Sequence, residues 1–209
     1  MSEDRRARRH NETVQEILDT ALEVMAEEGA AGLSLSEVAR RMGLRPPSLY
    51  QYFPSRMAIY DALFEWGARQ ELEVAERHRD RIASDPVAGL AAGQEAVLGW
   101  VQANPVLAQL LHWRPVPGFE PSARAFEPAV RQLELLRAAL RAAVDAGQLA
   151  PGAASEEGVA LCTVLASGVI SQQMSNEPSA PAGQGRFIRL APTALDMFFR
   201  YYAPKEDSS

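Results

Sequence analysis

Apolar residues recur with a helical period in the first part of the chain. They stand at the i, i+3, i+4 and i+7 spacing that places side chains on one stripe of an α-helix. The stripe consists of Val14, Ile17, Leu18, Ala21, Leu22 and Met25. Gly29 and Gly32 end this predicted helix. No alternating pattern typical of a half-buried β-strand occurs in the sequence, so an all-α fold is predicted.

Two shorter helices are predicted next. Ser34 is a suitable N-cap, and Glu37 three residues later completes the pattern of a capping box. Gly43 supplies a turn, and a third helix starts at Pro46 and Pro47, because a first helical turn does not need their missing N–H groups. Two short helices joined by a glycine turn are typical of a helix-turn-helix, in which the second helix enters the major groove of DNA.

The rest of the chain is predicted to be helical, with short breaks. The fourth helix is predicted over residues 55–82; it begins apolar and ends charged, as expected of a helix that links two domains. Later helices are predicted to start at residues 86 and 105, and to span 122–146, 155–175 and 186–202, with a flexible connector over 176–185.

Charge is unevenly distributed along the chain. The 21 Lys and Arg residues against 27 Asp and Glu give a net charge of −6, which by itself argues against a DNA-binding protein. Binding depends on local fields, however, and Arg5, Arg6, Arg8 and Arg9 form a basic segment before the first apolar stripe. The sequence leaves two interpretations open: a solvated, disordered tail or an arm inserted into a DNA groove.

Residues 13–64 closely resemble the N-terminal domain of the TetR family. The resemblance is carried by Ile17-Leu18, Ala21, Gly29, Ser34, Val38-Ala39, Gly43-Leu44, Ser48-Leu49-Tyr50, Tyr52-Phe53 and Ser55-Arg56. It implies a three-helix helix-turn-helix domain followed by a helical ligand-binding and dimerisation domain. The expected division is a basic flexible arm over 1–12, a DNA-binding domain over 13–56, a ligand-binding and dimerisation domain over 57–203 and a disordered tail over 204–209.

The resemblance also implies DNA-contacting residues. Ser34, Tyr50, Tyr52 and Arg56 stand where family members contact phosphate or sugar, and Ser36 stands where a side chain reaches toward a base. The start of the reading helix departs from the family pattern, because Arg45 replaces a capping serine and Pro46-Pro47 removes backbone donors. Base hydrogen bonds are then left to Arg45, Ser48 and Gln51, while the prolines offer apolar contact to a thymine methyl group. Whether Arg45 contacts guanine or a phosphate stays open.

Two further sets of residues are predicted from the resemblance and from their apolar character. An effector pocket for a small apolar or aromatic ligand is expected among the middle helices. Its candidate lining is Trp66, Trp100, Leu107, Leu111, His112, Trp113, Phe119, Phe126 and Met174. A homodimer interface is expected on the last two helices, although the same residues are also compatible with intramolecular packing. Its candidates are Leu161, Leu165, Val169, Leu195, Phe198, Phe199 and Tyr202.

Other classes of protein have little support in the sequence. His10, His78 and His112 are widely separated, Cys162 stands alone in an apolar run, and no phosphate-binding glycine loop or paired metal-binding motif is present, so no enzyme, metal or cofactor is predicted. No run of about 18 apolar residues and no signal sequence is found, which favours a cytoplasmic protein without a membrane partner. The predicted function is an operator-binding repressor released by its ligand. The alternatives are a helical adaptor that binds protein, or a small-molecule-binding protein without an operator.

Overall fold

A computed structural model describes residues 2–181 and 183–204 of the chain. The described residues form helices and connecting loops and contain no β-strand, so the predicted all-α fold is confirmed. Of the tail predicted over 204–209, all but residue 204 lies outside the described residues. The chain divides into two compact units. The first contains the chain up to Gly67 together with Val106–Phe126, and the second contains Ala68–Pro105 and the chain from Glu127 onward.

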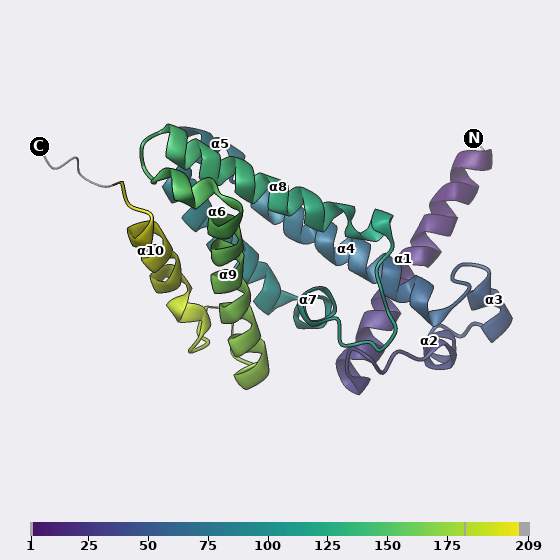
Figure 1. Cartoon of the computed structure of the whole chain (residues 1–209). Helices are drawn as coiled ribbons and strands as arrows, with labels where there is room; N and C mark the ends of the chain where they lie inside the picture. The colour runs from purple at the N-terminus through teal and green to yellow at the C-terminus, as the bar shows by residue number, and fades with distance from the viewer. Residues whose placement is uncertain (1, 182, 205–209) are drawn as a thin grey trace, which may run out of the picture. The chain divides into compact units, whose positions relative to one another are not determined.

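The first unit is built from the N-terminal helices (Figure 1). These are α1 (Ser2–Glu28), α2 (Leu35–Arg41), α3 (Pro46–Tyr50), the first half of α4 (Arg56–Glu76), most of α7 (Pro105–Trp113) and the first turn of α8 (Ala123–Asp145). The predicted stripe of α1 is largely buried, with Ile17 and Ala21 at 0% exposure. Burying such side chains stabilises the unit by about 1.5–3 kcal/mol for each large aliphatic group.

Aromatic side chains hold the loop after α7 and the first turn of α8 against α4. Phe119 packs on Tyr60 and Phe64 at centroid distances of 5.7 and 6.3 Å, and Phe126 stacks on Phe64 at 6.0 Å. Gly67 lets α7 approach closely, since a Cβ there would lie 3.0 Å from Leu111 Cδ1. The predicted domain boundary at residue 57 therefore differs from the division in the structure, where α4 contributes to both units.

Two predicted segments differ from the observed helices. Residues 2–12, predicted as a flexible arm, form the first turns of α1. The fourth helix was predicted to reach residue 82, but α4 ends at Glu76 and a separate helix, α5, spans Arg79–Ser84. Helix α5 packs closely on α6 (Pro86–Ala103), because Gly89 has no side chain: a Cβ there would lie 2.5 Å from the backbone of Ile82.

The second unit contains the remaining helices around one hydrophobic core. Its later elements are η1 (Pro151–Ala154), α9 (Glu156–Asn176), η2 (Ile188–Leu190) and α10 (Ala191–Tyr201). The core joins α8, α9 and α10 through Leu140, Ala143, Leu149, Ala153, Val159, Cys162 and Phe198. Cys162 is buried, and desolvation raises the pKa of its thiol to about 11, so it behaves as a small apolar side chain.

The segment predicted as a flexible connector is held by specific hydrogen bonds. Gln173, only 3% exposed, accepts hydrogen bonds from Phe187 N and Ile188 N at 3.2 and 3.1 Å and donates one to Glu177 O at 2.7 Å. Gly183 N donates to Gln102 Oε1 at 2.7 Å. These bonds anchor the connector near both of its ends. Residue 182 within it lies outside the described residues.

Helix α9 is a long apolar helix, although no run of about 18 apolar residues was expected from the sequence. It is 21 residues long with a mean hydropathy of 1.2, enough to cross a membrane by length and composition alone. Only 33% of its most apolar window is buried. An apolar helix of a protein core or an interface has the same composition, so this one helix is weak evidence for a membrane span.

Candidate DNA-binding site

Helices α2 and α3 form a helix-turn-helix in the first unit. Gly43 adopts φ +65°, a left-handed conformation that favours glycine, and Leu44 N donates to Ala39 O at 2.8 Å. Ala39 is 1% exposed, so its small side chain lies at the packed inner face of α2. The turn and the close packing fix the direction in which α3 leaves α2.

The N-terminal end of α3 is open to solvent. Arg45 is its N-cap residue, with extended backbone (φ −75°, ψ 139°) and no side-chain cap hydrogen bond, and Pro46 and Pro47 form the first turn. All three are exposed. The Arg45 guanidinium is thus not used in capping the helix, which leaves it available to a ligand at the exposed end.

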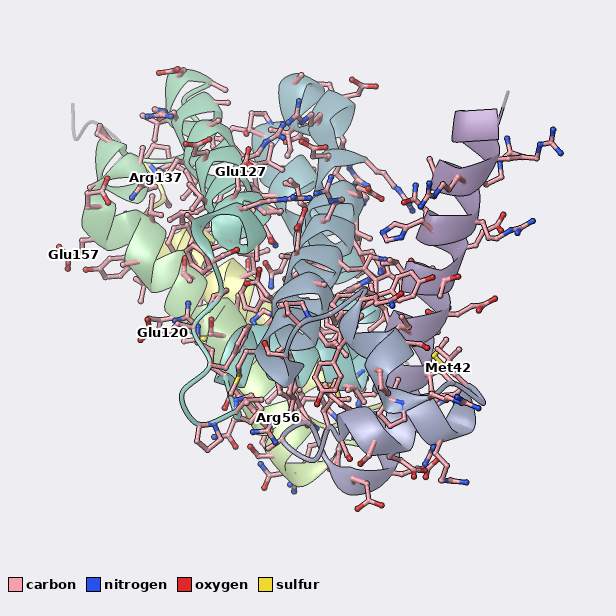
Figure 2. The ribbon with its side chains drawn as sticks, turned by 90° about the vertical axis from the view of Figure 1, so that its right-hand side faces the viewer. Met42, Arg56, Glu120, Glu127, Arg137 and Glu157 are labelled. Carbon is pink, nitrogen blue, oxygen red and sulfur yellow. The ribbon has the colours of Figure 1, made fainter. Side chains whose placement is uncertain are left out.

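Most of the other predicted reading residues share this exposed surface. Tyr50 is 51% exposed, Gln51 and Arg56 are exposed, and Ser48 is half-buried. Leu49 and Phe53 face the core at 1% and 7% exposure. Arg56 is the first residue of α4, where the positive end of the helix dipole adds to its charge (Figure 2).

Ser34 and Ser36 lie together at the start of α2. Their hydroxyl oxygens are 2.8 Å apart, and Ser34 Oγ accepts a hydrogen bond from Glu37 N at 3.4 Å. Ser34 is therefore the N-cap, as predicted. The second half of the predicted capping box is not formed, because the Glu37 carboxylate instead accepts hydrogen bonds from Arg40 and Arg41.

An ion-pair network braces α2 against α1. Arg41 donates two hydrogen bonds to Glu27 at 2.8 and 2.6 Å and a third to Glu37 at 2.8 Å. Hydrogen bonds from Arg40 and Arg41 lower the pKa of Glu37 to about 2, and the hydrogen bond from Arg41 lowers the pKa of Glu27. Both carboxylates therefore remain charged at neutral pH. Sequence reasoning missed this network, because residues 27 and 41 come together only through the fold.

Tyr52 contacts a residue that the sequence did not assign to the site. The rings of His10 and Tyr52 are stacked, with centroids 5.1 Å apart and planes 23° from parallel. His10 lies in the segment of α1 that was predicted as an arm. Nothing in the spacing of two residues so far apart in sequence signals this contact.

The predicted effector-binding residues are divided between the two units. Trp66, Leu107, Leu111, His112, Trp113, Phe119 and Phe126 belong to the first unit, and Trp100 and Met174 to the second. Leu107 and Phe119 are buried at 3% and 6%, whereas Trp113 and Phe126 are 37% and 36% exposed. Trp100 is 8% exposed and donates its indole N–H to Gln70 Oε1 at 3.3 Å. Their role as a pocket stays a prediction.

A groove of about 980 Å³ lies within the second unit, between α6 and the α10 region. Its apolar lining includes Leu98, Leu195 and Phe199, and Arg81 and Arg189 contribute positive charge. None of the predicted effector residues lines it. Leu195 and Phe199 were predicted instead as dimer-interface residues.

The predicted interface residues are only partly on the surface. Leu161, Leu165, Val169, Leu195, Phe199 and Tyr202 are half-buried. Phe198 is 1% exposed in one chain and belongs to the hydrophobic core; its predicted place in an interface stays a prediction. Sequence reasoning missed four large exposed apolar residues on or beside the same helices, namely Val164, Leu190, Met197 and Tyr201, at 64%, 53%, 63% and 74% exposure. They extend the apolar character of α9 and α10 to solvent.

Metal-binding geometry is not found in the described part of the chain. No group of three or more His, Cys, Asp or Glu side chains there is arranged to hold a metal ion. The candidate site is the exposed surface of α3 and its flanking residues, with Arg45, Tyr50 and Gln51.

Comparison with known proteins agrees with this geometry. Residues 17–63 match the family of bacterial regulatory proteins of the tetR type. The chain is 30% identical over 135 residues to the HTH-type transcriptional regulator Rv1816 of Mycobacterium tuberculosis, an alignment covering 64% of this chain and 58% of that protein. It is 27% identical over 177 residues to the class C tetracycline repressor protein of Escherichia coli, covering 85% and 74% of the two chains.

Solved structures share the fold over most of the chain. SCO4313, which is assigned as a regulatory protein, is 25% identical with a TM-score of 0.75, covering 92% of this chain and 97% of that one. PfmR, a TetR family transcriptional regulator from Thermus thermophilus, is 23% identical with a TM-score of 0.64, covering 88% and 97%. The helix-turn-helix, the match over residues 17–63 and these relatives together support a transcriptional regulator of the TetR family.

Proposed function

We propose that this protein is a transcriptional regulator that binds operator DNA through α3 and acts as a homodimer. The observation that carries the proposal is the exposed surface of α3, where Arg45 at the N-terminal end and Tyr50 and Gln51 at the C-terminal end are all exposed on a helix braced by α2. An α-helix fits the major groove of B-DNA, where each base pair presents a distinct pattern of hydrogen-bonding groups. The aligned relatives support the proposal, because one is an HTH-type transcriptional regulator and the other a tetracycline repressor protein.

Base recognition on this helix would be sparse. Pro46 and Pro47 provide no backbone donors, so Arg45, Ser48 and Gln51 are the side chains suited to base hydrogen bonds. Tyr50, Tyr52 and Arg56 would contact sugar and phosphate, which positions the helix without reading sequence. We therefore expect sequence-dependent DNA shape to contribute substantially to operator choice.

The apolar surface of α9 and α10 supports the proposed homodimer. Val164, Met197 and Tyr201 are each more than 60% exposed, and a monomer gains nothing from leaving such side chains in water. A partner helix pair would cover these residues together with the half-buried Leu161, Leu165, Val169, Leu195, Phe199 and Tyr202. Two half-sites about one helical turn apart require two reading helices at a fixed separation, which a dimer supplies.

We further propose that a small apolar or aromatic effector releases the protein from its operator, which makes it a repressor in the cytoplasm. The large side chains of the middle helices support this proposal, including Trp66, Trp113 and Phe126. FadR of Bacillus subtilis, which has the same fold at 19% identity and a TM-score of 0.65, was solved in complex with stearoyl-CoA. A ligand that prefers the conformation unsuited to DNA lowers operator affinity by the same coupling factor.

A gel-shift titration with DNA from upstream of the gene tests the proposal. The full chain should shift this duplex in preference to an unrelated duplex, and Arg45→Ala should reduce that preference. Arg141→Ala, an exposed arginine of α8 in the second unit, is the matched control and should leave binding unchanged. Equal affinity for the two duplexes, or no binding, would favour an adaptor or a ligand-binding protein without an operator.

A further inference from the structure

The N-terminal turns of α1 are an exposed basic helix. Residues 5–12 are all exposed, and this part of α1 extends past α2 and α3 (Figure 1). Arg5, Arg6, Arg8 and Arg9 supply its charge in a chain whose net charge is −6. The segment is thus the strongest concentration of positive charge next to the helix-turn-helix.

The helical form of this segment is electrostatically unfavourable by itself. Arg5 and Arg9 are four residues apart, and Arg6 and Arg9 three apart, so these like charges are neighbours on the helix surface. They also lie near the N-terminal end of the helix, where the dipole is positive and disfavours cations. A polyanion alongside the helix would remove both penalties.

The stacking of His10 on Tyr52 determines which arginine faces the reading helix. His10 contacts Tyr52 directly, and Arg6 lies four residues earlier, on the same face one turn nearer the N-terminus. Arg8 lies two residues from His10, which at about 100° per residue places it on nearly the opposite face. The two arginines are therefore chemically identical but differ in the direction they face.

The width of the helix decides where on DNA it fits. An α-helix with side chains is about 10–12 Å across, whereas the minor groove of B-DNA is about 6 Å wide. The basic helix therefore does not enter the minor groove as an extended arm would. The neighbouring major groove is the expected location of α3, which leaves the phosphate backbone beside it.

We propose that the basic helix of α1 is a second DNA-binding element, which lies on the phosphate backbone next to the half-site with Arg6 as its principal contact. His10 is a positioning residue that acts through its stacking on Tyr52. This inference rests on the proposed operator binding, and it extends the DNA-binding surface beyond the helix-turn-helix. It also replaces both interpretations of the segment that the sequence left open.

The test is the salt dependence of binding to the upstream duplex. Each lost phosphate contact reduces the slope of log affinity against log salt by about 0.9. Arg6→Gln should reduce the slope by about this amount for each of the two basic helices in the proposed dimer, while Arg8→Gln should leave the slope unchanged. Equal reductions in the two variants would mean an unpositioned basic tail, and no reduction in either would mean no contact; both results overturn the proposal.

A second pair of variants tests the role of His10. His10→Ala removes the stacking and should lower the slope, whereas His10→Phe keeps an aromatic ring on Tyr52 and should restore it. A slope lowered to the same extent by both would overturn the positioning role. Thermal unfolding of each variant checks that the fold is retained.

A small molecule that occupies the minor groove distinguishes binding of the basic helix to the phosphate backbone from insertion of the segment into the minor groove. It should leave the Arg6 contribution to the slope intact, since the backbone remains accessible; loss of that contribution would place the segment in the minor groove and overturn the proposal. Failure of the unmodified protein to bind the duplex at all would instead contradict the proposed function itself.

Discussion

Asp61 on α4 and Ser122 before α8 are joined by two hydrogen bonds. Ser122 N donates to Asp61 Oδ1 at 2.7 Å, and Ser122 Oγ donates to Asp61 Oδ2 at 2.8 Å. Ser122 also caps α8, since Ala125 N donates to its hydroxyl at 3.2 Å. The half of α4 that starts at Arg56 is therefore tied to the start of α8 within the first unit.

A double-mutant cycle of Asp61→Ala and Ser122→Ala measures this connection. Hydrogen bonds to a charged group contribute about 1.5–3 kcal/mol when buried, and solvent at this partly exposed site reduces the expected coupling to about 1 kcal/mol. Chemical unfolding of the four proteins gives the coupling free energy. Strictly additive effects would show that the contact adds no stability.

Tyr50 and Arg56 are expected to contact phosphate rather than bases. Tyr50→Phe and Arg56→Ala should therefore weaken binding to all DNA sequences alike, and Arg56→Ala should reduce the salt slope by roughly one. A salt titration with two unrelated duplexes provides the measurement, with Arg141→Ala as control. If either variant keeps the affinity of the unmodified protein throughout the titration, its assigned role is wrong.

The exposed residues of α9 and α10 predict which substitutions would break the proposed dimer. Val164→Glu or Met197→Glu should yield a soluble monomer with weakened operator binding, because both side chains are more than 60% exposed in one chain. Phe198→Glu should instead unfold the second unit, since a charge would enter its core. Light scattering reports the mass and circular dichroism the fold. A Met197→Glu protein that keeps a dimeric mass would place the interface elsewhere.

Local patterns predicted the helix-turn-helix well. The stripe of α1, the cap at Ser34, the turn at Gly43 and the proline start of α3 each depend on residues close together in sequence. Contacts between distant residues were not predictable: neither His10 on Tyr52 nor Asp61 with Ser122 leaves a periodic signal. The burial of Phe198 in the core was not predictable either, because α10 carries apolar residues on more than one face and the sequence does not say which face meets the core.

The ion pairs of α2 predict that the free energy of unfolding decreases at low pH. Glu37 has a pKa of about 2 in the folded protein against an ordinary value of 4.5, so the unfolded chain binds a proton first as the pH falls. The contribution of Glu37 is complete above pH 4.5 and is lost as the pH falls toward about 2. Glu37→Gln should thus flatten the acid side of a stability–pH curve. Glu73→Gln, on the exposed surface of α4, is the control; equal flattening in both variants would refute the assignment.

If the proposed effector binds at the predicted aromatic residues, their substitution should affect effector sensitivity and DNA affinity separately. Trp113 and Phe126 are more than one-third exposed, so Trp113→Ala or Phe126→Ala should change effector sensitivity while leaving DNA affinity without effector nearly intact. Phe119→Ala should lose both, because Phe119 packs on Tyr60 and Phe64 and its truncation costs about 3–5 kcal/mol of stability. Operator affinity is measured with and without apolar and aromatic metabolites, and a genuine effector should change it by roughly 5- to 150-fold.

Gly99→Leu serves as a comparison, since Gly99 lines the groove of the second unit and has open space for a side chain. If Gly99→Leu abolished the response and Trp113→Ala and Phe126→Ala did not, the effector would bind in that groove rather than at the predicted residues.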